Sequence, residues 1–136
     1  MKANELRIGN YVNIEGDVVK VKEIYEKSIH YANGEYESYA TEDFIQPIEL
    51  TEEVLLKIGF EDRKGYFNYS KVFGDENNYC DSIYIYYCAP LKHFKFTHDK
   101  VKEMDLQTMD LYNIQYLHQL QNSYFLLTGQ ELEIEL

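Results

Sequence analysis

Tyrosine, histidine and lysine residues at strand spacing are the strongest candidates for a binding site in this sequence. The runs SIYIYY and LKHFKF predict two neighbouring strands, and Tyr84 and Tyr86 share one face of the first. If the two strands pair, His93 and Lys95 join these tyrosines on the same sheet face. Flat aromatic rings beside a cation and a titratable donor can hold a nucleotide-like or anionic ligand, with His93, Lys95 or Lys92 meeting a phosphate.

The same spacing also fits simple packing, which we favour for this face. Aromatic residues that alternate along a strand usually contribute to the packing of a sheet. Tyr84 and Tyr86 would then pack beneath the last helix, with their hydroxyl groups at its solvent-exposed rim. His118, which lies beside Gln119 in that helix, is likewise interpreted as a hydrogen-bonded structural group and not as a catalyst.

The other residues with reactive or metal-binding side chains lack the spacing that such sites require. No histidine pairs with another histidine or with a cysteine at zinc-ligand spacing, and the sequence has neither a phosphate-binding glycine loop nor a nucleophilic serine motif. Cys80 and Cys88 would lie about 26 Å apart in a single strand, well beyond disulfide reach. We therefore predict no metal, no cofactor and no catalytic residues, although an enzyme site assembled from distant residues remains an open alternative.

Charge and hydropathy limit the partners that this protein can have. The 136 residues carry a formal net charge of −11, which disfavours direct binding to nucleic acid because phosphate backbones repel an acidic protein. The one lysine-rich stretch, residues 92–102, contains Asp99 and is interpreted as a solvated surface.

No apolar run approaches the ~20 residues of a membrane span, and the first residues, MKANELRIGN, lack the apolar core of a secretory signal. A cytoplasmic protein without membrane contact is expected.

Four or five short antiparallel strands are predicted in residues 1–47. Alternating apolar residues on both sides of a turn at 15–17 predict the first two strands. Asn33-Gly34 predicts a second turn, in which both residues take positive φ, between the strands SIHYA and EYESY, and FIQ is the candidate for a fifth strand. The order R-I-G-N-Y-V…G-D-V-V-K-V-K-E-I looks like the opening of SH3-like barrels. A small SH3-like β-barrel or a strongly curved sheet is therefore expected.

The rest of the chain, residues 48–136, predicts an α+β lobe. A short helix capped by Thr51 and ended by Gly59 precedes strands at 66–73, 79–88 and 91–97, while 99–112 is either a short helix or an irregular connection. The last quarter predicts an amphipathic helix that ends at Gly129 and whose apolar face is interrupted by Gln121. Strict alternation in 131–136 predicts a terminal strand.

The expected fold class is α+β, in one compact unit. A β-rich lobe, residues 1–47, precedes an antiparallel sheet that is packed by the C-terminal helix and closed by the terminal strand. Because its last residues contribute to the core, we expect the chain to be a complete domain.

Segments at both ends of the chain resemble one group of small uncharacterised proteins. The similarity lies in ELRIGNYV, residues 5–12, and in LHQLQNSYFLLTGQELEIEL, residues 117–136, and PIELTEEVLLKIGFE, residues 47–61, fits the same pattern. Members of this group are encoded in bacterial genomes and their prophages. The resemblance implies a shared fold and a mobile-element setting, and it carries over no catalytic residues because the group has no known activity.

These observations lead to three hypotheses about function. The first, which we favour, is a non-enzymatic interaction protein, such as a phage accessory or anti-defence factor, that binds a host protein. Its acidic surface and aromatic patch would capture a basic partner. The second is a protein that binds or sequesters a small nucleotide-like ligand on the tyrosine face, and the third is an enzyme without a recognisable motif. Homo-oligomerisation through an apolar surface or an exposed edge strand is compatible with all three.

Overall fold

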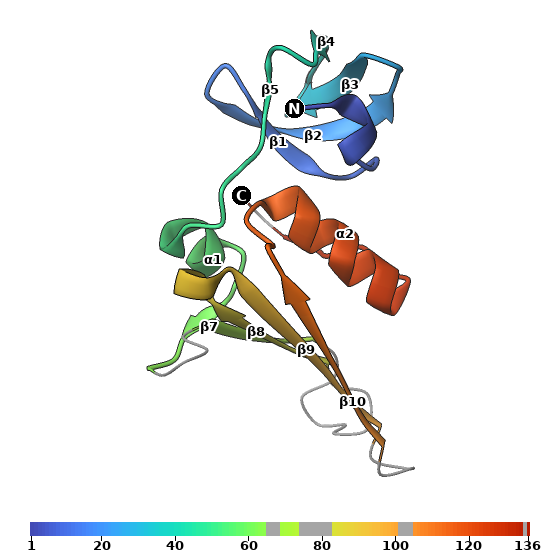
Figure 1. Ribbon diagram of the computed structural model, residues 1–136. Coiled ribbons are helices and arrows are strands. Elements are labelled where there is room, and N and C mark those ends of the chain that lie inside the picture. Colours follow the sequence, from blue (N-terminus) through green and yellow to red (C-terminus); the bar gives the residue numbers. More distant parts are fainter. Residues whose placement is uncertain (65–68, 74–82, 101–104, 135) are drawn as a thin grey trace. The chain divides into compact units, whose positions relative to one another are not determined.

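The fold is α+β, and the chain divides into two compact units (Figure 1). The computed structural model describes residues 1–64, 69–73, 83–100, 105–134 and 136. Residues 1–49 form the first unit together with 115–134 and 136, and residues 50–114 form the second. Within the described residues, each unit contains one five-stranded antiparallel sheet. The sequence pattern predicts that the last helix belongs to the second lobe, whereas in the structure it groups with the N-terminal residues.

The first sheet contains all five strands that the sequence predicts. Their spatial order is β4-β3-β2-β1-β5, and every neighbouring pair is antiparallel. Among the described residues no pairing joins β4 to β5, so the sheet stays open and the closed-barrel alternative is wrong. A short 3₁₀ helix, Ala3–Glu5, precedes the strands, which are β1 Tyr11–Ile14, β2 Asp17–Ile24, β3 Ser28–Asn33, β4 Tyr36–Thr41 and β5 Ile45–Gln46.

The turn between β3 and β4 lies one residue later than the sequence predicts. Asn33 pairs with Tyr36 as the last residue of β3, so the two-residue loop consists of Gly34 and Glu35. Only Gly34 has a positive φ, +61°, because a single glycine at the first loop position is sufficient for one of the two common hairpin turns. The expectation that Asn33 also takes a positive φ is therefore wrong.

One face of the first sheet forms the apolar core of its unit. The buried side chains alternate along each strand, as expected for a sheet with one covered face. Each fully buried valine or isoleucine contributes roughly 1.5–3 kcal/mol to stability. The cluster consists of Ala3, Leu6, Val12, Ile14, Val19, Val21, Ile29, Ala40 and Ile45.

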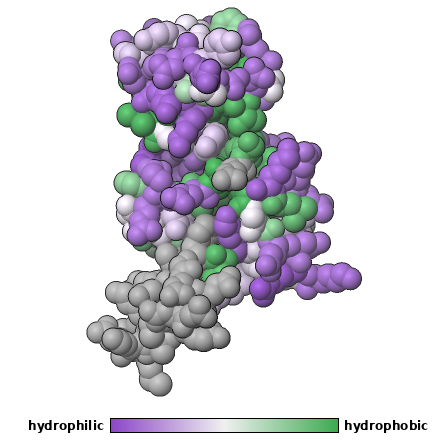
Figure 2. Space-filling model, turned by 180° about the vertical axis from the view of Figure 1, so that it is seen from behind, coloured by the Kyte–Doolittle hydropathy of each residue, from purple (hydrophilic) through white to green (hydrophobic). Residues whose placement is uncertain are grey.

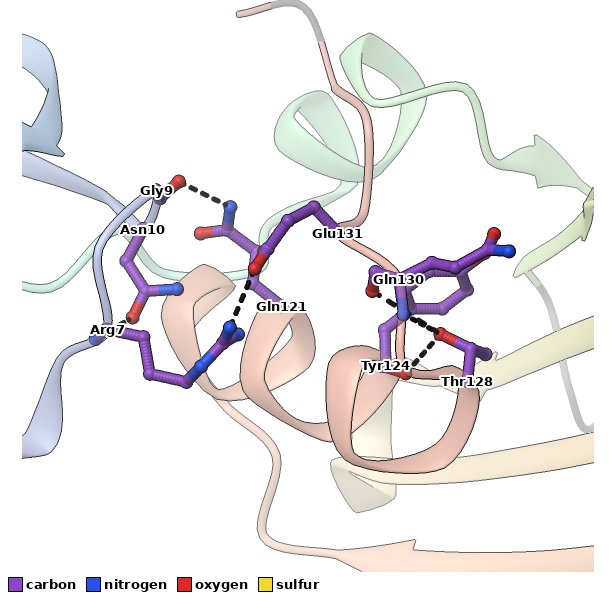
Figure 3. A network of polar contacts seen from close by, with 8 residues as sticks. All are labelled: Arg7, Gly9, Asn10, Gln121, Tyr124, Thr128, Gln130 and Glu131. Atoms are coloured by element: carbon purple, nitrogen blue, oxygen red, sulfur yellow. Dashed lines mark hydrogen bonds and ion pairs between the residues drawn. The ribbon is translucent and has the colours of Figure 1, made fainter.

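The C-terminal helix, α2 Leu117–Thr128, is joined to the N-terminal segment by polar contacts (Figure 3). Gln121, which is 1% exposed, accepts a hydrogen bond from the Tyr11 N–H at 2.9 Å and donates one to the Gly9 carbonyl at 3.2 Å. Arg7 forms a 2.6 Å ion pair with Glu131, and its guanidinium lies 3.6 Å from the centre of the Phe125 ring. The polar residue that interrupts the apolar helix face thus satisfies backbone groups 110 and 112 positions away along the chain.

The chain beyond α2 corrects the prediction of a terminal strand. Gly129 ends the helix with φ +72°, as predicted. Leu132 is buried between exposed glutamates, so the alternation correctly predicts burial. The described residues 130–134 and 136 nevertheless form no strand, because alternation determines which side chains face the core but supplies no neighbouring strand to pair with.

The second sheet has the order β10-β9-β8-β7-β6 and is also antiparallel. The ambiguous residues 99–112 contribute the end of β9 and the whole of β10, which pairs with β9 along its full length. Residues 66–68 and 79–82 of the predicted strands lie outside the described residues, as does Cys80. The strands are β6 Glu61–Asp62, β7 Tyr69–Phe73, β8 Ile83–Cys88, β9 His93–Lys100 and β10 Asp105–Tyr112, and a 3₁₀ turn, Ala89–Leu91, joins β8 to β9.

A short helix, α1 Glu52–Lys57, contributes apolar side chains to the second core. As predicted, the Thr51 hydroxyl accepts a hydrogen bond from the Val54 N–H at 3.3 Å, and Gly59 follows the helix with φ +86°. Phe60 meets Phe94 edge to face, with 6.3 Å between ring centres. The buried residues of this unit include Leu50, Leu55, Ile58, Phe60, Tyr69, Ile85, Tyr87, Phe94 and Phe96.

Candidate functional site

The second sheet has the predicted tyrosine face. In the strand register, Tyr86 lies opposite Lys95, and Cys88 lies opposite His93, so the predicted residues of β8 and β9 share one side of the sheet. The rings of Tyr84 and Tyr86 are nearly parallel, with 11° between their planes and 6.4 Å between their centres. Lys92 does not belong to this row, because it lies in the corner before β9 with φ +49°.

The histidine of this face has partners within the sheet. His93 Nε2 lies 2.8 Å from Asp110 Oδ1, and the His93 ring stacks on Tyr112 with 4.4 Å between centres. Asp110 is also the residue of β10 directly opposite Lys95. His93 is 7% exposed and its contacts join β9 to β10, whereas Tyr84, Tyr86 and Lys95 are the more exposed predicted ligand groups of this face.

A cavity of about 300 Å³ lies beside the edge of the same sheet. Its lining includes Glu61 and Arg63, whose charged groups are 3.7 Å apart. Lys71 also lines it, donates a hydrogen bond to the Ile58 carbonyl, and has its pKa lowered by burial. Among the described residues that line the cavity, these charged groups are paired with one another or with the backbone.

The exposed face of the first sheet carries a more sharply defined cluster around His30. In the register, Glu23 of β2, His30 of β3 and Tyr39 of β4 form one row across three strands. His30 Nδ1 lies 3.8 Å from Glu23 Oε1, and His30 Nε2 lies 3.5 Å from Glu37 Oε2. The His30 ring stacks on Tyr39 with 4.7 Å between centres. The imidazole is thus held between two carboxylates and one aromatic ring.

Two tyrosines make this cluster aromatic as well as acidic. Tyr25 and Tyr39 are 44% and 64% exposed, and their ring centres are 6.0 Å apart. The Tyr25 hydroxyl donates a hydrogen bond to Glu23, and this bond is the largest cause that raises the pKa of Tyr25 to about 12. We call Glu23, Tyr25, His30, Glu37 and Tyr39 the acidic tyrosine face.

The chemistry of the acidic tyrosine face suits a cationic group. Exposed carboxylates accept charge-assisted hydrogen bonds from lysine or arginine, and the faces of tyrosine rings attract the same cations. The neighbouring strand pair illustrates this second contact, because Lys20 of β2 lies 5.6 Å from the centre of the Tyr11 ring. Figure 2 shows mostly hydrophilic surface over the first sheet, at the top of the view.

Sequence reasoning missed this face, although the strand segments SIHYA and EYESY contain its histidine, glutamate and tyrosine residues. The predicted loop at Asn33-Gly34 also gives these two strands a different register. That loop would put His30 opposite Glu37, whereas the loop at residues 34–35 puts His30 opposite Tyr39. The sequence nevertheless contains a signal for this face, because the side chains of His30, Glu37 and Tyr39 lie on the same side of the sheet in both registers. The actual register adds the ring contact to the carboxylate contacts.

Comparisons with known proteins leave the site to be interpreted from its own geometry. The chain matches no protein-family model, no curated protein and no solved structure. Within the described part of the chain, no three histidine, cysteine or acidic side chains gather to hold a metal ion. The helices of that part are all too short or too polar to cross a membrane.

Proposed function

We propose that this protein is a non-enzymatic interaction protein that captures a basic segment of another protein on the acidic tyrosine face. The observation that carries the proposal is the arrangement of Glu23 and Glu37 on two sides of His30, next to the exposed rings of Tyr25 and Tyr39. A lysine or arginine from a partner would meet carboxylates and ring faces together, which is a stronger site than either alone.

The charge of the first unit supports the same class of partner. This unit contains twelve acidic and five basic residues, a balance of −7 out of the −11 of the whole chain. Such a field accelerates association with basic proteins and opposes binding to nucleic acid. From the resemblance to prophage-encoded proteins we further propose that the partner is a host protein. The protein would then act as a phage accessory or anti-defence factor that blocks this host protein through the acidic tyrosine face.

A peptide selection tests this proposal with random sequences in place of the natural partner. A library of random peptides would be selected on the wild-type protein, on the double variant Glu23→Gln with Glu37→Gln, and on the control Asp62→Asn with Glu133→Gln. The control removes the same charge from two exposed positions outside the face. We expect the wild type and the control to enrich lysine- and arginine-rich peptides whose binding weakens with added salt, and the face variant to lose this enrichment. Selected peptides without a basic excess, or equal loss in the control, would contradict the proposal.

A second candidate function is binding of a nucleotide-like ligand by the second sheet. The parallel rings of Tyr84 and Tyr86 favour it, because parallel aromatic rings offer flat stacking surfaces beside the cation of Lys95. Native mass spectrometry of protein purified from a bacterial host tests it directly. An added mass of a few hundred daltons that disappears on denaturation supports this candidate, and a mass that Tyr84→Ala leaves bound excludes the assigned face.

A further inference from the structure

We infer that the basic segment binds as a sixth strand along the edge of β4, with lysine or arginine at every second position. This inference rests on the proposed function and specifies its partner. β4 is an edge of the first sheet, since β3 is the strand with which it pairs in the described part of the chain. An edge strand presents a row of backbone donors and acceptors that another chain can pair with.

The hairpin register identifies which backbone groups point outward from β4. In a two-residue hairpin the pair that closes the loop, here Asn33 and Tyr36, exchanges hydrogen bonds, and such pairs alternate along the ladder. Ser38 and Ala40 therefore bond to β3, while the backbone groups of Glu37 and Tyr39 face away from it. Thr41, which has the parity of Glu37 and Tyr39, fits this pattern, because its carbonyl accepts a hydrogen bond from the Phe44 N–H at 3.0 Å outside the β3–β4 ladder.

The two residues with outward backbone groups also supply side chains to the acidic tyrosine face. Glu37 lies 3.5 Å from His30, and Tyr39 stacks on it, so both side chains lie on the exposed side of the sheet. A strand added to β4 would place side chains directly opposite these two, at about 4.5–5.5 Å between Cβ atoms. Because strand side chains alternate, only every second residue of the partner meets this face, and these are the positions at which lysine or arginine is required.

Charge complementarity selects a basic partner over a second copy of this chain. Pairing of β4 with another β4 would bring the carboxylates of two Glu37 residues into one small region, next to Glu35 at the loop. Like charges that oppose each other across a strand pair are destabilising, and charged residues on edge strands are a common means of preventing self-association. A strand that carries lysine or arginine reverses the sign of this interaction.

Two synthetic peptides of equal composition test the inference on the full-length protein. One alternates lysine and threonine, and the other carries its lysines in one block followed by its threonines. Binding would be measured by fluorescence anisotropy, and amide hydrogen exchange of Glu37 and Tyr39 would be followed by NMR, with Ser38 and Ala40 as internal controls. Two further versions of the alternating peptide carry N-methyl groups on either the lysine or the threonine amides, because only one of these two sets faces β4 in a paired strand.

Strand addition predicts a specific pattern of results. The alternating peptide should bind about tenfold more tightly than the block peptide, and one N-methylated version, but not the other, should lose about 30-fold in affinity through two missing hydrogen bonds. Exchange should slow at Glu37 and Tyr39 and stay unchanged at Ser38 and Ala40. Equal binding of all peptides would overturn strand addition and leave the proposed function intact, whereas no binding by any of them would overturn both. Protection of Glu37 and Tyr39 that grows with protein concentration in the absence of peptide would assign the edge to a second copy and also overturn the inference.

Discussion

Replacement of Gln121 by leucine tests how the two ends of the chain are held together. Leucine has a similar volume and preserves the helix, so the substitution removes two hydrogen bonds without creating a large cavity. The Tyr11 N–H loses its acceptor at 2.9 Å, and the Gly9 carbonyl loses its donor at 3.2 Å. Both backbone groups are partly buried, and the leucine side chain has no polar atom with which they could form a hydrogen bond.

The expected loss follows from the number of groups left without a partner. An unsatisfied buried donor or acceptor costs about 1–3 kcal/mol, and the carbonyl tolerates the loss better than the N–H because of its second lone pair. We therefore expect Gln121→Leu to lower the free energy of unfolding by about 2–4 kcal/mol. Gln130→Leu, the same substitution at an exposed position, should change it by less than about 0.5 kcal/mol.

Urea unfolding followed by far-ultraviolet circular dichroism measures both variants under identical conditions. Amide exchange at Tyr11 provides a local readout, since this N–H should exchange faster in Gln121→Leu than in the wild type. A change below about 0.5 kcal/mol for Gln121→Leu, or an equal loss in Gln130→Leu, would refute the claim that the hydrogen bonds of Gln121 help to hold α2 on the N-terminal segment.

Three further substitutions test individual contacts. Burial lowers the pKa of His118 against an opposing effect of Glu5, so the unfolded chain binds a proton more readily and stability should fall as the pH drops below about 6.5. Urea unfolding at neutral and mildly acidic pH should show this fall in the wild type and a smaller one in His118→Gln, and identical falls would contradict it. Gly59→Ala should lower the free energy of unfolding by about 1–2 kcal/mol because Gly59 has φ +86°, and an unchanged urea midpoint would show that the helix end tolerates a side chain. Glu23→Gln should lower the pKa of Tyr25 from about 12 towards 10, as measured from its ring resonances, and an unchanged titration would remove the contact that joins Tyr25 to the acidic tyrosine face.

Local signals in the sequence predict most of the secondary structure. Apolar alternation identifies the strands of the first sheet, and the Thr51 cap and the glycines at 59 and 129 define the helix ends because these effects act within a few residues. Contacts between distant residues are harder to predict. The helix pattern marks Gln121 as a polar interruption, but it contains no information about Gly9 and Tyr11, which satisfy that side chain.

In the two candidate sites, too, the sequence predicts which side chains share a face but does not predict their distant partners. Parity along β8 and β9 correctly places Tyr84, Tyr86, His93 and Lys95 on one face, yet it does not reveal that Asp110 binds His93, because residues 99–112 are ambiguous in sequence. Within the acidic tyrosine face, the direct pairing of His30 with Tyr39 depends on a register that the position of the hairpin loop determines. A shift of one residue in the loop moves every cross-strand partner by two positions, so the contact between His30 and Tyr39 emerges only from the folded hairpin.

The most direct test of the central claim is an NMR titration of the labelled protein with the peptide of alternating lysine and threonine. We predict that the amide resonances of β2, β3 and β4 around Glu23, His30, Glu37 and Tyr39 shift in a saturable way, and that Glu23→Gln with Glu37→Gln suppresses these shifts. Saturable shifts confined to the second sheet around Tyr84 and Tyr86, or no saturable shifts in the first sheet, would contradict the claim that the acidic tyrosine face binds a basic partner.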